Sequence, residues 1–175
     1  MNSWLMMATA TVLALCSPAA AARQEPANTP SSEVNRPPND RTGDVLLGAL
    51  SLVGVKYRYG GDSRELGFDC SGFVRHVFAE SADLPLPRTS FEMSRLGEAV
   101  DEISLAPGDL VFYNTRKRRY SHVGIYLGDG RFIHSPSRGK QVEIVDMADV
   151  YWKKRFNGAR RLLLPESQTP PGPAQ

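Results

Sequence analysis

The sequence predicts an α+β domain in which helices come first and an antiparallel sheet follows. Two stretches in the first half, residues 45–53 and 70–81, carry apolar residues at helical spacing. From residue 109 onward, short apolar runs alternate with turns that contain Gly or Pro, which is typical of strands. The chain has 175 residues, a length that suits one domain with its own core.

The first 41 residues are predicted to lie outside this domain. Residues 1–22 carry no charge and end in three alanines, so they are interpreted as a cleaved export signal, although no Lys or Arg precedes the apolar stretch. A lipoprotein with lipid on Cys16 ranks second, because Leu15 is large for the position before such a cysteine. A retained membrane anchor ranks third, since the apolar run is short. Residues 23–41, rich in Pro, Asn and Ser, are predicted to be a disordered linker.

The domain itself is assigned to residues 42–165, and its first half is predicted to be helical. Residues 45–53 form a helix that stops at Gly54, and residues 55–59 lead in extended form into a loop. Asp69 is an N-cap residue for the helix 70–81, and the prolines at 85 and 87 keep the next segment extended. Residues 89–92 (TSFE) form a capping box that opens a short helix ending at Gly97.

The second half is predicted to be a sheet. A turn is expected at residues 128–130 and a short helix at 147–151. The five expected strands are residues 109–113, 122–127, 131–134, 142–145 and 156–164. Residues 166–175 are Pro-rich and are expected to form a disordered tail.

Charge and cysteine content narrow the function. The net charge is +2, which gives no reason to expect a nucleic-acid partner. Cleavage of the signal would separate Cys16 from Cys70, so no disulfide is predicted. A reduced cysteine in an exported protein suggests chemistry.

Cys70 is the candidate nucleophile. It lies in the first turn of a predicted helix, where the dipole favours a thiolate and such thiols titrate at roughly 3.5–7.5. His122 begins a strand directly after a polar loop, and His134 ends the partner strand. His76 lies almost two turns into the Cys70 helix and points away from its start. Cys70, His122 and His134 therefore form a candidate nucleophile, base and orienting group.

For His134 to orient His122, both side chains must project from one face of their hairpin. A turn of three residues at 128–130, or an equivalent bulge, places His134 opposite Gly124 and on the His122 face. A plain two-residue Asp129-Gly130 turn would place His134 opposite Ile125, on the other face. We expect the first arrangement, although Asp-Gly favours a two-residue turn.

The motifs resemble those of the NlpC-type cell-wall endopeptidases, a papain-like family of bacterial cysteine peptidases. The resemblance covers residues 42–164 in order, and these stretches carry it: 55–61 (VKYRYGG), 68–74 (FDCSGFV), 86–90 (LPRTS), 107–112 (PGDLVF), 121–128 (SHVGIYLG), 132–135 (FIHS), 151–156 (YWKKRF) and 159–161 (ARR).

The resemblance implies a papain-like fold and acyl transfer on peptidoglycan stem peptides. It implies that Cys70 is the nucleophile, His122 the general base and His134 the third polar residue. Tyr57 would lie near the oxyanion, with Tyr59 as a rival. It implies no metal and no organic cofactor, and a place in the periplasm or cell envelope. We also expect a monomer.

Several alternatives stay open. A zinc ion could take Cys70, His122 and His134 as ligands, or the chain could be a non-catalytic wall-binding module. An amidase or transacylase could use the same triad. The bond that is cut is also undetermined, with the D-glutamyl–diaminopimelate bond and the diaminopimelate–D-alanine cross-link as candidates. The basic run 116–119 (RKRR) could steer a substrate or form an ordinary solvated loop.

Overall fold

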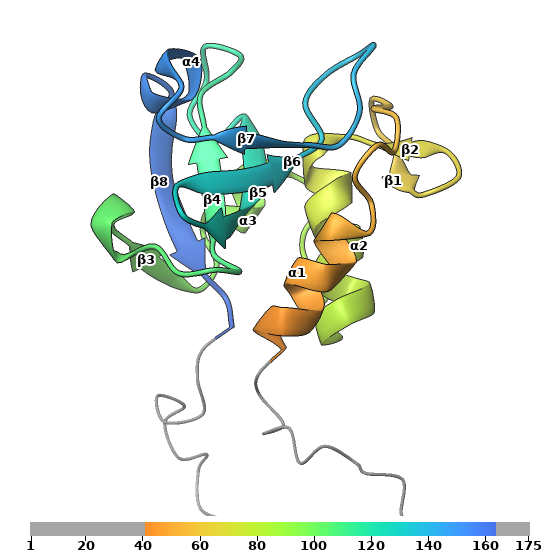
Figure 1. The fold of residues 1–175 in the computed structure, drawn as a ribbon, viewed down its shortest axis with the longest axis horizontal. Coiled ribbons are helices and arrows are strands. Elements are labelled where there is room, and N and C mark those ends of the chain that lie inside the picture. Colours follow the sequence, from red (N-terminus) through yellow and green to blue (C-terminus); the bar gives the residue numbers. More distant parts are fainter. Residues whose placement is uncertain (1–40, 164–175) are drawn as a thin grey trace, which may run out of the picture. The chain divides into compact units, whose positions relative to one another are not determined.

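The computed structural model describes residues 41–163, which form helices and an antiparallel sheet as predicted (Figure 1). The predicted export signal, the linker up to residue 40 and the tail lie outside the described residues. Among the residues that are described, none forms a helix long and apolar enough to cross a bilayer.

The two main helices come from the N-terminal half of the domain and pack against each other. Helix α1 spans Thr42–Leu50 and α2 spans Cys70–Ala82. The chain leaves α1 through a turn that ends at Gly54, whose φ of 88° suits glycine. Between the helices, β1 (Asp62–Ser63) and β2 (Gly67–Phe68) pair in a small hairpin within the stretch predicted to be a loop. α2 thus begins directly after β2 and Asp69.

The capping box at Thr89 and Glu92 is confirmed, but the helix that it opens is shorter than predicted. Helix α3 spans only Ser90–Met93, and turns follow it. The prediction missed β3 (Glu98–Val100) and the 3₁₀ helix η1 (Glu102–Ser104). β3 lies at the sheet edge with mostly exposed residues, so its sequence lacks an alternating apolar pattern, and its pairing with β8 makes it a strand.

The second half forms a six-stranded antiparallel sheet in the order β3-β8-β4-β5-β6-β7. All five predicted strands are present, with bounds that differ by up to three residues. They are β4 (Leu110–Tyr113), β5 (His122–Gly128), β6 (Arg131–His134), β7 (Glu143–Asp146) and β8 (Phe156–Arg161). The predicted short helix begins later than expected, as α4 (Val150–Lys153), because the Asp149 side chain caps it at Tyr151 N–H.

A bulge at the β5–β6 turn places His122 and His134 on the same face of the hairpin, as predicted. Gly128 pairs with Arg131 and Tyr126 pairs with Phe132, so Leu127 is the extra residue. Asp129 and Gly130 have φ of 51° and 70°, which is the two-residue turn that Asp-Gly favours. The local turn signal and the predicted register are therefore both correct, because the bulge reconciles them.

The sheet separates two apolar clusters. The larger lies between the helices and one sheet face, and it includes Phe73, Val77, Val123 and Ile125. The smaller lies on the other face and includes Tyr113 and Phe132, with Trp152 packed against it. Alternation along β5 and β6 directs His122 and His134 to the side of the smaller cluster.

Candidate active site

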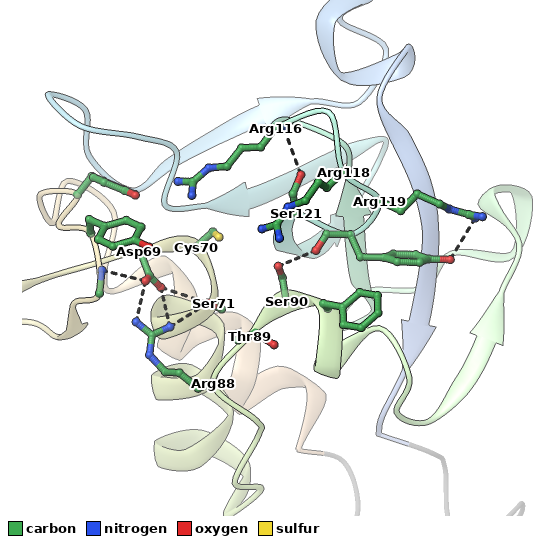
Figure 2. A pocket seen from close by; sticks show the side chains of 15 residues that line it. Asp69, Cys70, Ser71, Arg88, Thr89, Ser90, Arg116, Arg118, Arg119 and Ser121 are labelled. Carbon is green, nitrogen blue, oxygen red and sulfur yellow. Dashed lines mark hydrogen bonds and ion pairs between the residues drawn. The ribbon is translucent and has the colours of Figure 1, made fainter.

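Cys70 is the first residue of α2, and Asp69 fixes this helix start. Asp69 has extended backbone angles, and its Oδ1 accepts the Gly72 N–H at 2.7 Å, so the predicted N-cap is confirmed. The Arg88 guanidinium donates to both Asp69 carboxylate oxygens, at 3.0 and 2.7 Å, and to Ser71 Oγ at 2.9 Å. A two-point ion pair therefore holds the residue before the nucleophile (Figure 2).

The same network sets the charge of Asp69. Burial works to raise the pKa of this carboxyl, but the hydrogen bonds from Arg88 and Gly72 outweigh it and hold the pKa below its ordinary value. Asp69 is therefore an ionised cap. Sequence analysis did not anticipate its pairing with Arg88, because residues nineteen positions apart show no local signal.

The thiol of Cys70 does not have the lowered pKa that its place in the helix predicts. Cys70 is partly exposed at a pocket wall, yet the surrounding protein desolvates the thiol and raises its pKa, and the Asp69 charge adds to this. Backbone N–H groups of Val123 and Ser71 act in the opposite direction, with a smaller effect. The lowered pKa expected from the helix start is thus corrected to a raised one, because desolvation outweighs the helix start.

The contact with Val123 also brings the nucleophile to β5. The backbone N–H of Val123 acts on the Cys70 thiol and works to lower its pKa, and Val123 directly follows His122. The start of α2 and the start of β5 therefore meet at the sulfur, as the nucleophile–base reading requires.

The two histidines form a buried pair. His122 Nε2 lies 2.8 Å from His134 Nδ1, and the side chains share one face as predicted. His122 is 3% exposed and His134 is completely buried. Burial, with the Arg116 charge adding to it, lowers the pKa of His122 to about 3. Burial and the neighbouring His122 lower the pKa of His134 well below its ordinary value. Both imidazoles are therefore neutral near pH 7.

Trp152 of α4 covers this pair and was not identified as a site residue from the sequence. Its ring stacks on His122 at a centroid distance of 5.6 Å and meets His134 edge-on at 4.8 Å. It thereby keeps solvent from the pair. A tryptophan in a polar stretch (YWKKRF) was the only available signal, and it gives no indication of what the ring will touch.

Tyr57 and Tyr59, the two candidates for the oxyanion site, differ in how they lie in the pocket. Tyr57 lines the pocket, and the Cys70 and Asp69 charges contribute to raising its pKa, after burial, which is the largest cause. Tyr59 also lines the pocket but is 73% exposed. His76 packs on Phe68, with ring centroids 5.0 Å apart, and does not line the pocket. Tyr57 is therefore the better-placed phenol.

Cys70 opens into a pocket of about 680 Å³. One wall comes from the α2 start and residues 57–60, another from residues 88–91, and a third from the loop 116–121. Ser121 Oγ accepts the backbone N–H groups of Thr115 and Arg116, at 3.0 and 3.2 Å (Figure 2). These bonds hold the loop at the residue that directly precedes His122.

The geometry also bears on the metal alternative. No group of three or more His, Cys, Asp or Glu side chains within residues 41–163 is placed to hold a metal ion. His122 Nε2 and His134 Nδ1 lie at hydrogen-bond distance from each other, so these two nitrogens are paired with each other and do not point at a shared metal ion.

Comparison with known proteins gives one consistent family. The model of the NlpC/P60 family matches residues 54–161. The chain is 40% identical over 121 residues to murein DD-endopeptidase MepH of Escherichia coli K12, covering 67% of this chain and 45% of that protein. It is 42% identical over 134 residues to the probable endopeptidase NlpC of the same organism, covering 72% of this chain and 86% of that protein. The chain thus spans about half the length of some of its curated relatives.

Solved structures agree. An NlpC/P60 family protein from Bacillus cereus superposes with a TM-score of 0.66 and 36% identity, over 74% of this chain and 44% of that one. The predicted α+β, papain-like fold class is thereby confirmed.

Proposed function

The chain belongs to the NlpC/P60 family, and from this premise we propose that it is a peptidoglycan endopeptidase using Cys70 as its nucleophile. Relatives that are named murein endopeptidases support this activity. The observation that carries the proposal is the meeting of Cys70 with β5 beside the His122–His134 pair, at the wall of an open pocket. The substrate would be an amide bond in murein stem peptides or their cross-links.

The resting state is a neutral thiol beside a neutral imidazole, so attack requires a proton transfer. For His122 Nδ1 to accept the thiol proton, its hydrogen must sit on Nε2 and be donated to His134 Nδ1. His134 thus fixes the tautomer of His122, as an orienting group does in a catalytic triad. The sulfur then bonds to the substrate carbonyl carbon, and the proton passes to His122.

The next steps return the proton and release the products. The carbonyl oxygen becomes an oxyanion, which the Tyr57 hydroxyl and the Cys70 backbone N–H would stabilise. Protonated His122 gives its proton to the leaving amine as the carbon–nitrogen bond breaks. Water, deprotonated by His122, then attacks the acyl-enzyme and releases the carboxylic acid and the Cys70 thiol. An amidase or transacylase would differ only in the bond that is cut or in the acyl acceptor.

The remaining roles follow from the same proposal. Catalysis would need no metal and no organic cofactor, and the protein would act as an exported monomer in the periplasm or cell envelope. N-terminal sequencing of the mature protein would support export if it begins near residue 23, whereas a retained N-terminal methionine on a cytoplasmic protein would contradict it. Lipid on Cys16 would select the lipoprotein form.

Digestion of purified sacculi tests the activity. The wild-type protein should release soluble muropeptides, and their masses identify the bond that is cut. Cys70→Ala and Cys70→Ser should reduce release by at least about 1,000-fold, because the nucleophile is lost. Circular dichroism should show an unchanged fold, and His76→Gln serves as a control at a histidine outside the pocket. Release by either Cys70 variant at the wild-type rate would overturn the proposal.

A further inference from the structure

The pocket wall opposite the start of α2 carries the guanidinium groups of Arg116 and Arg118. Arg116 and Arg118 extend from the loop toward the side where Cys70 lies (Figure 2). Within residues 41–163, neither forms an ion pair with a carboxylate. Of the other pocket arginines, Arg88 is neutralised by Asp69. Arg119 has no carboxylate partner either, but its guanidinium lies over the Tyr120 ring at 5.2 Å and donates to the Tyr120 hydroxyl.

Arg116 is held in place next to the reacting groups. Its guanidinium lies over the Tyr59 ring at 5.8 Å, and its charge acts to lower the pKa of Tyr57. Its backbone N–H donates to Ser121 Oγ, one residue before His122. Its charge reaches Cys70, His122 and Tyr57. A positive charge so close to the nucleophile, with no carboxylate at ion-pair distance among residues 41–163, is suited to a negative group on the substrate.

We propose that Arg116 and Arg118 bind a free carboxylate on the peptide substrate, close to the scissile bond. Two guanidinium groups match the planar geometry of a carboxylate, and hydrogen bonds to charged groups are among the stronger ones. The sequence left the basic run 116–119 open between a substrate-steering role and an ordinary solvated loop. In this proposal only Arg116 and Arg118 of that run contact the substrate. This inference rests on the proposed function, because it names the class of peptide that the same pocket takes.

Synthetic stem peptides test the subsite. Three versions are compared: free carboxylates throughout, the C-terminal carboxylate amidated, and the carboxylate nearest the scissile bond amidated. Full-length wild type, Arg116→Gln and Arg118→Gln are assayed on each. Arg138→Gln is the control, since Arg138 is exposed, carries the same charge and does not line the pocket.

For the free peptide, Arg116→Gln should lower kcat/KM by about 10- to 100-fold, mainly through KM, and Arg118→Gln should do so to a smaller extent. For one of the two amidated peptides, wild type should have a low kcat/KM, and the Arg116 and Arg118 variants should lower it no further. The carboxylate that is amidated in that peptide is the one that the two arginines bind. Equal losses on all three peptides, or a wild type indifferent to amidation, would overturn the subsite. Failure of the proposed function is distinct, because wild type would then cleave no version.

A different observation concerns the far side of the histidine pair. His134 Nε2 is buried and has no hydrogen-bond partner among the described residues. Glu143 is its direct cross-strand partner on β7, and Glu143 Oε1 lies 3.8 Å from that nitrogen. Lys140 Nζ lies 3.6 Å from the same oxygen and competes for it. The polar and charged groups around His134 are therefore His122 from β5, Glu143 from β7 and Lys140 before β7, and the rings of Phe132 and Trp152 pack against it.

We infer that Glu143 is a positioning residue that accepts the Nε2–H of His134. Its carboxylate is partly exposed, so a small rotation closes the distance to a hydrogen bond. With its hydrogen held on Nε2, His134 presents Nδ1 as an acceptor to His122 Nε2–H. His122 Nδ1 then stays free to accept the thiol proton. The relay thus extends across three neighbouring strands, from β5 through β6 to β7.

Two substitutions separate this role from a merely structural one. Glu143→Gln keeps an acceptor oxygen and should retain kcat within about threefold, whereas Glu143→Leu should lower kcat by about tenfold with little change in KM. Imidazole ¹⁵N NMR should show the Nε2–H tautomer of His134 in wild type and Glu143→Gln, and a mixture in Glu143→Leu. A Glu143→Leu variant with wild-type kcat and an unmixed tautomer would overturn the inference.

Discussion

The reactivity of Cys70 depends on two opposing influences on its thiol. The start of α2 offers N–H groups that favour a thiolate, while desolvation and the Asp69 charge favour the thiol. The second influence is larger in the free protein. In the proposed mechanism, His122 would therefore have to remove the thiol proton during attack.

Alkylation of Cys70 measures this balance directly. We expect the rate of reaction with iodoacetamide to rise with pH through an inflection above the ordinary thiol value, because only the thiolate reacts. The measurement is the second-order rate constant between pH 5 and pH 10, followed by mass spectrometry of the Cys70 peptide. An inflection between about 4 and 7 would show an ion pair with His122 instead.

The buried histidine pair should also make folding stability depend on pH. The folded pKa of each imidazole is lowered, so the pair contributes stability that is present above the unfolded value near 6.5 and is lost as pH falls. For His122 this loss extends from about 6.5 down to about 3. The free energy of unfolding should therefore fall by up to about 1.4 kcal/mol per pH unit for each imidazole.

Urea denaturation between pH 4.5 and pH 7.5 checks this dependence. In His122→Gln, the free energy of unfolding should depend less steeply on pH than in wild type, because the contribution of the His122 imidazole is lost. His76→Gln serves as the comparison for removing a histidine, since that ring packs on Phe68 outside the pair. An identical slope in wild type and His122→Gln would contradict the lowered pKa.

At the scale of elements, the β5–β6 hairpin decides whether the two histidines can meet. The Asp129-Gly130 turn alone would pair Leu127 with Phe132 and send His134 to the other face. The bulge absorbs Leu127, so Tyr126 pairs with Phe132 and Gly124 comes opposite His134. A Cβ on Gly124 would lie 2.7 Å from the Ile133 carbonyl oxygen, so this close approach of β5 and β6 requires glycine at position 124.

Two deletions test the role of this bulge. Removing Leu127 alone should leave the ladder regular and His134 opposite Gly124, so activity should stay within about tenfold, with some stability lost because Leu127 packs on the core. Removing Leu127 and Gly128 together should place His134 opposite Val123, on the wrong face, and abolish activity. The measurement is hydrolysis of a stem peptide. Equal activity of the two variants would contradict the register argument.

At the scale of the whole molecule, one core joins the helices to the sheet. Residues from α1, α2, β4, β5 and β6 share the larger apolar cluster, so the two halves that bring Cys70 and His122 together fold as a unit. The described residues 41–163 also contain every residue of the proposed site. The domain assigned to residues 42–165 is thus expected to be self-sufficient.

A fragment of residues 42–165 tests this assignment. It should unfold in one cooperative transition, with a Tm within about 3 °C of the longer chain, and should hydrolyse a soluble stem peptide at the same kcat/KM. Calorimetry and the peptide assay provide the two measurements. A fragment that fails to fold would show that the flanking residues belong to the domain.

The sequence by itself determined the fold class and the order of the main elements, and it predicted Cys70, His122 and His134 as a candidate group. These depend on periodicity, capping and turn chemistry, which act between residues close in the chain. The same local rules predicted the face shared by the two histidines. They missed β3, because an exposed edge strand becomes a strand only through its partner.

Only the tertiary structure decided the electrostatics of the site. The raised pKa of the Cys70 thiol, the Trp152 cover over the histidines and the separation of Arg116 and Arg118 from Arg119 all depend on residues far apart in the chain. Desolvation and Coulomb interactions depend on distance in space and on the surrounding medium, not on sequence position. For that reason the helix start alone predicted a thiolate, and the packed site holds a thiol.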